Sequence, residues 1–317
     1  MLNVVNRKKI FFTIPAVILV LGIIFYFVHG GFNLDVDFTG GTNLQLDLGQ
    51  QFEEKDITDI VSTTIPGLTP SSIIKGGDNG TEVTIKLKEL SDEESTKVLN
   101  AIREKYDPSY KAGDETVVED EKAEASGDTA ATESGFKVFS RDTVSATIGK
   151  ELGRSAVLSA VIAILLMLVY ISFRFEFWSG IASITALTHD VLMVLSIYAI
   201  FNLPINTTFI AAILTIVGYS INATIVIFDR VRENDRFAKK IPFGEIVDKS
   251  IAQSITRSVN TSLTTLLSIL VLYIIGVDSI KQFALPIIIG IVVGTYSSVT
   301  IAGPMWHTLK GGNKSAK

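Results

Sequence analysis

The sequence predicts a polytopic α-helical membrane protein that carries one small extracytoplasmic α+β domain. Three observations support this fold class. Hydrophobic residues make up 47% of the 317 residues. They gather in blocks close to the ~20 residues that a membrane-spanning helix needs. One long polar region separates the first block from the others, so we expect six transmembrane helices, at Ile10–Val28, Arg154–Ile171, Trp178–Phe201, Ile205–Phe228, Ser258–Ile275 and Phe283–Ala302.

The first block follows Arg7, Lys8 and Lys9 and therefore has the outline of a signal peptide. Its apolar run is longer than the core of a usual signal peptide, and no small-x-small cleavage pattern follows it. We therefore expect residues 1–28 to form a cytoplasmic N-terminus and a retained first span.

Lys and Arg are unevenly distributed between the two ends of the expected spans. With the N-terminus inside, the inner segments are rich in basic residues, whereas the two short outer connections hold only Lys281. The positive-inside rule, which applies to short loops, then places both termini in the cytoplasm. We expect a bundle of five further spans over residues 154–309, with a cytoplasmic loop at 229–257 and a cytoplasmic tail at 310–317.

The polar region at 29–153 predicts an extracytoplasmic domain of mixed type. Leucine at every second position from Leu44 to Leu48 indicates a half-buried strand, and a capping box opens the second helix. The order β-α-β-β-α-β is that of a ferredoxin-like module. The expected elements are Asn43–Leu48, Glu53–Thr63, Ser72–Ile74, Glu82–Leu87, Ser91–Tyr106 and Phe136–Ser140.

Residues 112–135 interrupt this domain. The segment is acidic, rich in small residues and poor in large apolar ones, so it cannot bury enough apolar surface to offset the entropy of ordering. We expect a disordered acidic insertion.

Two carboxylates stand in Phe32–Thr42, FNLDVDFTGGT, just after the first span. Asp35 and Asp37 would share one face of a strand, as a general acid/base pair requires. No nucleophile or metal-ligand cluster accompanies them. The favoured interpretation is that both are solvated and lead into a tight turn at Gly40-Gly41, a conformation that other residues resist.

The composition excludes several kinds of site. The sequence contains no cysteine and only three histidines, so neither a disulfide nor a zinc site is expected. We expect no cofactor and no nucleic-acid partner.

Six short motifs lie along the chain in a characteristic order. Each is weak alone, but their order and spacing cover nearly the whole sequence. They are Asp37–Gly41 (DFTGG), Ile148–Leu152 (IGKEL), His189–Val191 (HDV), Gly218–Asn222 (GYSIN), Asp229–Asn234 (DRVREN) and Ser258–Ser262 (SVNTS). Together they resemble the SecF family of protein-export membrane subunits.

This resemblance implies a six-span half of an RND-type transporter with one extracytoplasmic domain after the first span. It implies a non-enzymatic, accessory role in Sec protein export at the bacterial cytoplasmic membrane. The implied partners are SecD, which supplies the other half, the SecYEG channel, the translocating polypeptide and the lipid bilayer. The ion gradient would then promote a late step of translocation.

Asp190, beside His189, lies about halfway along the third expected span. A carboxylate at the centre of a span costs about 3 kcal/mol on insertion scales. Two interpretations stay open for Asp190: an ion-relay carboxylate or its hydrogen-bond partner, and a structural polar anchor between packed helices. His189 is more simply explained by packing.

The fourth span has a polar centre that includes Ser220 and Asn222, and Arg257 opens the fifth. On sequence alone, Arg257 is explained as a basic anchor at the membrane face. SecF-like proteins typically carry an Asp in a Ser-Ile-Asn-Asp run and an Arg at the start of the fifth span, linked to proton passage. Arg257 matches the second, but Ala223 stands at the place of the first.

Three explanations of Ala223 stay open. The relay of this half rests on Asp190, or the partner subunit carries all of it, or the chain is a coupling-defective form. Asn222 and its hydroxyl-bearing neighbours bind water but do not release protons near neutral pH.

Small residues in the spans predict helix packing. Gly218 is one such residue, and Gly290 and Gly294 form a GxxxG pair in the sixth span.

Two other functions fit part of the pattern. An RND-like exporter of lipids or small molecules usually has twelve spans and two large outer loops, whereas this sequence predicts six and one. An intramembrane aspartyl protease needs two buried carboxylates that share a proton, and only Asp190 is clearly buried.

Overall fold

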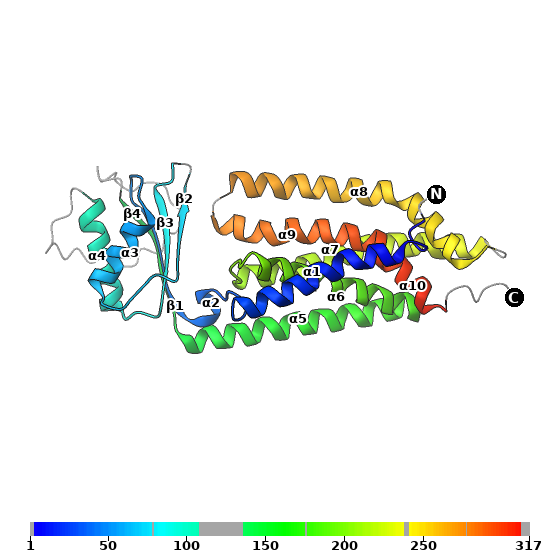
Figure 1. The fold of residues 1–317 in the computed structure, drawn as a ribbon, viewed down its shortest axis with the longest axis horizontal. Coiled ribbons are helices and arrows are strands. Elements are labelled where there is room, and N and C mark those ends of the chain that lie inside the picture. The colour runs from blue at the N-terminus through cyan, green and yellow to red at the C-terminus, as the bar shows by residue number, and fades with distance from the viewer. Residues whose placement is uncertain are drawn as a thin grey trace. The chain divides into compact units, whose positions relative to one another are not determined.

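The structure is a computed structural model, and it describes residues 3–77, 79–107, 136–174, 176–237, 241–276 and 278–311. It consists of two units, drawn as ribbons in Figure 1. A helical unit comprises Met1–Leu34 and Arg154–Lys317, and an α+β unit comprises Asp35–Gly153. The insertion predicted at 112–135 lies outside the described residues.

Long apolar helices build the helical unit, which confirms the predicted fold class of a multi-pass helical membrane protein. Among the described residues, 5 helical stretches are long and apolar enough to cross a membrane. Helix α5 (Ala146–Arg174) contains the second expected span. The 5 stretches are α1 (Lys8–Val28), α6 (Phe177–Ile200), α7 (Thr207–Phe237), α8 (Phe243–Ile275) and Ile280–Leu309, the last built from α9 (Asp278–Ser297), the π-helix η1 (Ser298–Ala302) and α10 (Gly303–Leu309).

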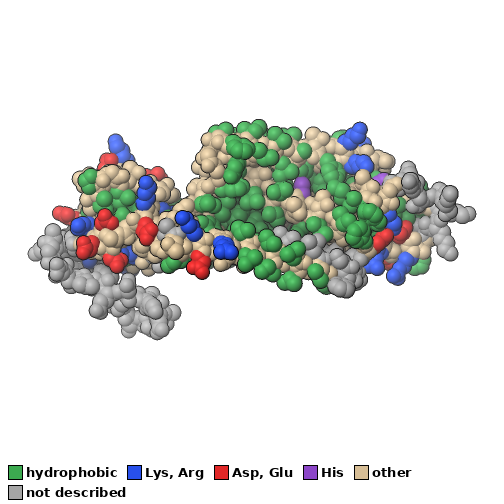
Figure 2. Space-filling view, turned by 90° about the horizontal axis from the view of Figure 1, so that it is seen from below, with side chains coloured by type: hydrophobic (Ala, Val, Ile, Leu, Met, Phe, Trp, Pro, Cys, Tyr) green, Lys and Arg blue, Asp and Glu red, His purple; other side chains and the backbone are tan. Residues whose placement is uncertain are grey.

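The outer surface of this unit is apolar. Figure 2 shows green hydrophobic side chains over most of the visible side of the helices, with charged side chains gathered toward the end that carries both termini. Exposed residues such as Val17, Leu158 and Leu267 contribute to this surface. Apolar side chains on the outside are what a helix in contact with lipid requires.

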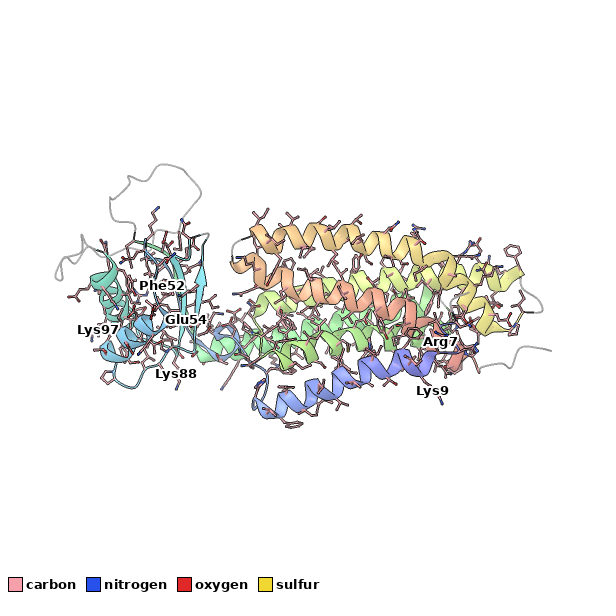
Figure 3. The ribbon with its side chains drawn as sticks, turned by 45° about the horizontal axis from the view of Figure 1, so that its top comes forward. Arg7, Lys9, Phe52, Glu54, Lys88 and Lys97 are labelled. Carbon is pink, nitrogen blue, oxygen red and sulfur yellow. The ribbon has the colours of Figure 1, made fainter. Side chains whose placement is uncertain are left out.

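The two ends of the chain meet at one end of the helical unit. The backbone N–H groups of Val4 and Val5 donate to Asp248 Oδ1 at 2.9 and 3.0 Å, and Lys8 Nζ donates to Thr308 Oγ1 at 3.1 Å. Figure 3 shows Arg7 and Lys9 at this same end. Basic residues therefore gather where α1 begins and α10 ends.

Helices α7 and α8 extend beyond the expected spans. Residues 229–237 continue α7 and residues 243–257 begin α8, so the segment expected as a loop at 229–257 is largely helical. Phe243, Ile246 and Val247 are buried, and Phe243 packs edge-on against Trp306. Phe243, Ile246 and Val247 thus pack against the protein's own helices, whereas Phe237 and Ile241 of the same segment are exposed.

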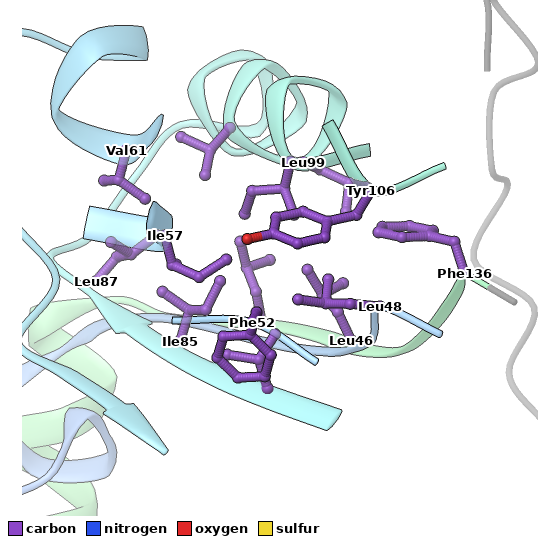
Figure 4. Packing of buried hydrophobic residues seen from close by; sticks show 14 of the residues in the cluster. Leu46, Leu48, Phe52, Ile57, Val61, Ile85, Leu87, Leu99, Tyr106 and Phe136 are labelled. Atoms are coloured by element: carbon purple, nitrogen blue, oxygen red, sulfur yellow. The ribbon is translucent and has the colours of Figure 1, made fainter. Parts of the chain in front are cut away.

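The α+β unit has the expected ferredoxin-like order. Strands β1 (Gly41–Asp47), β2 (Ser72–Gly76), β3 (Glu82–Leu87) and β4 (Lys137–Val144) form an antiparallel sheet in the order β2-β3-β1-β4. Helices α3 (Glu54–Thr64) and α4 (Asp92–Tyr106) pack on one face. Figure 4 shows this core, in which Leu46, Ile57, Ile85 and Leu99 meet.

The segment before β1 differs from the prediction of two solvated aspartates. Asp35 is buried; it accepts a hydrogen bond from Val36 N at 2.7 Å and pairs with Lys86 of β3. It thereby caps the one-turn helix α2 (Val36–Thr39), which the alternating sequence did not indicate. The glycine part of the prediction holds: Gly41 has φ +157°, and a Cβ there would overlap the carbonyl oxygen of Leu87.

Candidate functional site

Asp190 is a buried carboxylate in the helical unit. It sits on α6 with its side chain 1% exposed. Ser220 of α7 donates its hydroxyl to Asp190 Oδ2, and Ser297 of α9 donates to the same oxygen at 2.8 Å. Three helices therefore converge on one carboxylate.

His189 contacts the other oxygen of Asp190. Its Nδ1 lies 2.9 Å from Asp190 Oδ1, a distance at which a protonated Nδ1 donates to the carboxylate. His189 Nε2 is buried and has no hydrogen-bond partner among the described residues. The imidazole thus has one nitrogen committed to Asp190 and one available to water or an ion.

Small residues of α9 make this convergence possible. A Cβ at Gly290 would overlap the side chain of Ile216 on α7. A Cβ at Gly294 would lie 3.2 Å from Ser220 Cβ and 3.6 Å from Asp190 Oδ2. The GxxxG pair therefore lies where α9 approaches α7, and this close approach brings Ser297 within reach of Asp190.

The regular α-helical pattern stops directly after Ser297. Residues Ser298–Ala302 form a π-helical segment before α10 resumes the α-helix. π-Bulges within helices occur frequently at functional sites, because they shift the register of the following side chains.

A second polar place lies between α7 and α8. It is a cavity of about 120 Å³. Arg257 stands on its wall and, among the described residues, makes no ion pair. The residues that matter for its chemistry are Tyr219, Asn222 and Ala223 from α7, and Arg257, Ser258 and Thr261 from α8.

The structure thus divides the sequence-predicted polar residues between two places. Ser220 joins Asp190, whereas Asn222 and Ala223 join Arg257. The division follows from helix geometry: residues two apart on an α-helix point about 200° apart, so Ser220 and Asn222 occupy opposite sides of α7. Gly218 is at neither place; a Cβ there would meet only Met167 Cε, at 4.0 Å.

Sequence reasoning missed Ser297, which completes the Asp190 site. A signal was present, because Gly290, Gly294 and Ser297 follow one another at i, i+4 and i+7 and therefore share one helix face. It also missed Tyr219 and Ser258, which line the cavity beside Arg257. Nothing in their spacing distinguishes them from other hydroxyl residues of the spans.

The chain is similar to known proteins over nearly all of its length. A family model described as protein export membrane protein SecD/SecF, C-terminal, matches residues 125–312. The protein translocase subunit SecF of Sebaldella termitidis is 33% identical over 317 residues, which cover 100% of this chain and 94% of the relative. That of Acidaminococcus fermentans is 35% identical over 311 residues, which cover 96% of each chain.

Fused relatives are similar to this chain over only part of their length. The protein translocase subunit SecDF of Thermus thermophilus is 35% identical over 299 residues, which cover 90% of this chain and 36% of the relative. The crystal structure of SecDF from that organism, titled a translocon-associated membrane protein, has a TM-score of 0.78 at 33% identity and covers 96% of this chain and 38% of that one. The chain therefore corresponds to a little over a third of a SecDF protein.

Proposed function

The chain belongs to the SecD/SecF family of protein-export membrane proteins, and we propose that it uses the ion gradient to promote a late step of polypeptide export. Relatives that match it along nearly their full length are protein translocase subunits named SecF. We propose that the chain acts as an accessory translocase subunit, without an enzymatic step of its own.

The fused relatives support SecD as a proposed partner. In SecDF proteins, a region equivalent to this chain is continuous with the SecD part. We infer that a separate SecD subunit supplies the second transporter half here. A SecYEG-type channel, the translocating polypeptide and the lipid bilayer complete the proposed surroundings. The basic end of the helical unit supports a cell-membrane orientation with both termini in the cytoplasm.

We further propose that Asp190 is the ion-coupling carboxylate of this half. The observation that carries this is the placement of its side chain, 1% exposed, between hydroxyl donors of two other helices. Among the described residues no Lys or Arg pairs with it, so the carboxylate is not locked in a permanent ion pair. Its only ion-pair contact there is with His189.

Hydroxyl partners suit a carboxylate that gains and loses a cation. A serine hydroxyl donates to a carboxylate, and the same hydroxyl can rotate to accept from a carboxylic acid or to bind a small cation. Ser220 and Ser297 can therefore serve both states of Asp190 without a movement of the backbone. Asn222 is not part of this mechanism, because it faces the cavity of Arg257.

The test is gradient-driven translocation in vesicles that contain the channel, the SecD partner and this chain. Depletion of the chain should slow a late step of export. Asp190→Asn keeps the size of the side chain but removes its charge, and should lower the gradient-dependent part of the rate at least about ten-fold. Ser196→Ala is the matched control, because within the described structure the Ser196 hydroxyl donates to its own helix, at Leu192 O.

Co-purification with SecD separates loss of coupling from loss of assembly. The Asp190→Asn chain should purify with its partner in normal yield. An unchanged gradient-dependent rate in a normally assembled Asp190→Asn complex would overturn the role of Asp190. Export kinetics that do not change on depletion would overturn the function itself.

A further inference from the structure

The Asp190 site contains one buried polar atom that the proposed function does not yet use, Nε2 of His189. Nδ1 of the same ring lies 2.9 Å from Asp190 Oδ1, whereas Nε2 has no hydrogen-bond partner among the described residues. Buried polar atoms almost always have a partner, so an exception in a native structure calls for an explanation. A side chain that only fills space needs no polar atom at membrane depth, and packing alone therefore does not account for His189.

The hydrogen bonds around Asp190 assign the tautomer of His189. Ser220 and Ser297 both donate to Asp190 Oδ2, the second at 2.8 Å. A carboxylate accepts hydrogen bonds on both oxygens, so Oδ1 remains for a protonated Nδ1. In the neutral imidazole the other nitrogen is then an acceptor. Nε2 therefore has a free lone pair and, among the described residues, no donor that fills it.

No other charged side chain of the described structure pairs with His189 or Asp190. Their only ion-pair contact there is with each other. The apolar stretches of three helical segments packed against α6 contain no Asp, Glu, Lys, Arg or His, namely residues 10–28 of α1, 207–228 of α7 and 283–302 of α9 and η1. The titratable side chains of these stretches are Tyr26, Tyr219 and Tyr296. Helix α10 also packs against α6, and the ring of its His307 stacks on Phe243.

The residue types at this site suit a proton better than a metal cation. Hard cations take oxygen ligands, and an imidazole nitrogen next to the carboxylate adds none. The described residues contain no group of three or more His, Cys, Asp or Glu that could hold a metal ion. Imidazole, in contrast, is the side chain that gains and loses a proton near neutral pH in water.

We propose that His189 receives on Nε2 the proton that drives this transporter half, while Asp190 fixes the tautomer and balances the charge of the imidazolium. This inference rests on the proposed coupling role of Asp190, and it names the ion and the atom that binds it. The proton adds to the lone pair of Nε2, and no other bond forms or breaks. The ring changes from neutral to singly positive, so the pair changes from singly negative to neutral. Release of the proton from Nε2 reverses the step.

Nitrogen NMR of the full-length chain in lipid bilayers tests the tautomer and the site of protonation directly. The chain is labelled with ¹⁵N-histidine, and spectra are recorded from about pH 9 to about pH 5, the range around the ordinary titration of imidazole. The signals of His189 are those that persist in both His29→Gln and His307→Gln, because the sequence has three histidines. At high pH we expect a protonated Nδ1 and a bare Nε2, and Nε2 should become protonated as the pH falls.

Asp190→Asn tests whether the carboxylate supports this protonation. The imidazolium then loses its negative partner, so the midpoint of the His189 titration should move to lower pH by about one unit or more. A ring protonated on Nε2 at high pH, or no uptake of a proton across the range, would overturn the proposal. So would a midpoint that is the same in wild type and in Asp190→Asn.

Gradient-driven translocation by the complex with SecD tests the role of His189 in coupling. His189→Gln keeps a side-chain N–H for Asp190 but cannot take up a proton, and should lower the gradient-dependent rate at least about ten-fold in a normally assembled complex. The matched control is His29→Gln, because the ring of His29 contacts Ala199 O and not Asp190. It should keep the rate.

The two variants of the pair separate this inference from the proposed function. A normal rate in His189→Gln with a low rate in Asp190→Asn would overturn His189 as the proton carrier and leave the role of Asp190 standing. Normal rates in both variants would overturn both. Low rates in both, with protonation of Nε2 in the wild type, are the result that we expect.

Discussion

The two polar places of the helical unit differ in where their partners come from. Asp190 finds its hydrogen-bond donors within the chain, on α7, α9 and the neighbouring His189. Arg257, on the other side of α7, stands beside orphan hydroxyls and no carboxylate in the described structure. At the first place the chain supplies hydrogen-bond donors to both oxygens of the carboxylate, whereas at the second no carboxylate stands among the residues that line the cavity.

The largest loss of unfolding free energy is expected when Asp190 loses both of its serine hydrogen-bond donors. In the combined variant Ser220→Ala, Ser297→Ala, a buried carboxylate keeps only His189. A hydrogen bond to a charged group contributes about 1.5–3 kcal/mol, so the variant should lose about 3 kcal/mol or more of unfolding free energy. Denaturation in mild detergent measures this. A loss below about 1 kcal/mol would show that water replaces the serines and that Asp190 is not held within the chain.

A smaller loss of unfolding free energy is expected from substitutions at the glycines where α9 approaches α7 closely. Gly290→Ala would drive a methyl group into Ile216, and overpacking of this kind costs about 1–3 kcal/mol. Gly294→Ala, whose Cβ would lie 3.2 Å from Ser220 Cβ, should cost less.

A double-mutant cycle checks that the cost arises at this contact. Adding Ile216→Ala to Gly290→Ala should recover part of the loss, with a coupling of about 0.5–3 kcal/mol, because the two residues touch directly. Strictly additive free energies of unfolding would contradict the contact.

Two single serine variants, one beside Asp190 and one beside Arg257, compare the two polar places directly. Ser297→Ala alone removes a donor that Asp190 uses, whereas Ser258→Ala removes a hydroxyl that has no partner in the described residues. For the isolated chain, Ser258→Ala should stay within about 0.5 kcal/mol of wild type. Equal losses for the two variants would erase this distinction between the two places.

The smallest loss of stability is expected in the α+β unit, on removal of the charge of Glu94. This carboxylate lies at the protein surface and accepts hydrogen bonds from Ser91. The backbone N–H and the hydroxyl of Ser91 lower the pKa of Glu94 below its ordinary value. Because the folded state favours the charged form, this stabilisation is present above the unfolded-state pKa of about 4.3 and is lost as the pH falls further.

Hydrogen exchange at the first turn of α4 measures this stabilisation in the full chain. Protection at pH 6 should decrease slightly in Glu94→Gln, and the difference from wild type should vanish at pH values well below 4.3. A difference that persists in acid would mean that the charge of Glu94 does not contribute.

The elements of the fold were largely predictable because their signals are local. Apolar runs located the spans, and alternation in β1 and the capping box at Ser91 located the domain. The one-turn helix α2 was not predicted because its cap, Asp35, is fixed by Lys86 of a distant strand. The long extensions of α7 and α8 were not predicted because their buried face packs against Trp306 and the N-terminal segment, far away in sequence.

The site was predictable only in its charged members. Asp190 and Arg257 stand out because ionisable residues are rare in apolar spans. Their neighbours are serines and a tyrosine, residue types that also occur in other spans without such a role. That Ser220 joins Asp190 while Asn222 joins Arg257 depends on how α7 is rotated, and the packing of α7 against Gly290 and Gly294 of α9 fixes that rotation.

The most direct test of Asp190 as the coupling carboxylate is an infrared difference spectrum of the assembled complex. Spectra are recorded with and without the driving ion gradient, for wild type, Asp190→Asn and Ser196→Ala. We predict a carboxyl band that changes with the gradient in wild type and in Ser196→Ala and is absent in Asp190→Asn. A gradient-dependent carboxyl band of full size in Asp190→Asn would contradict the assignment and would place coupling in the partner subunit.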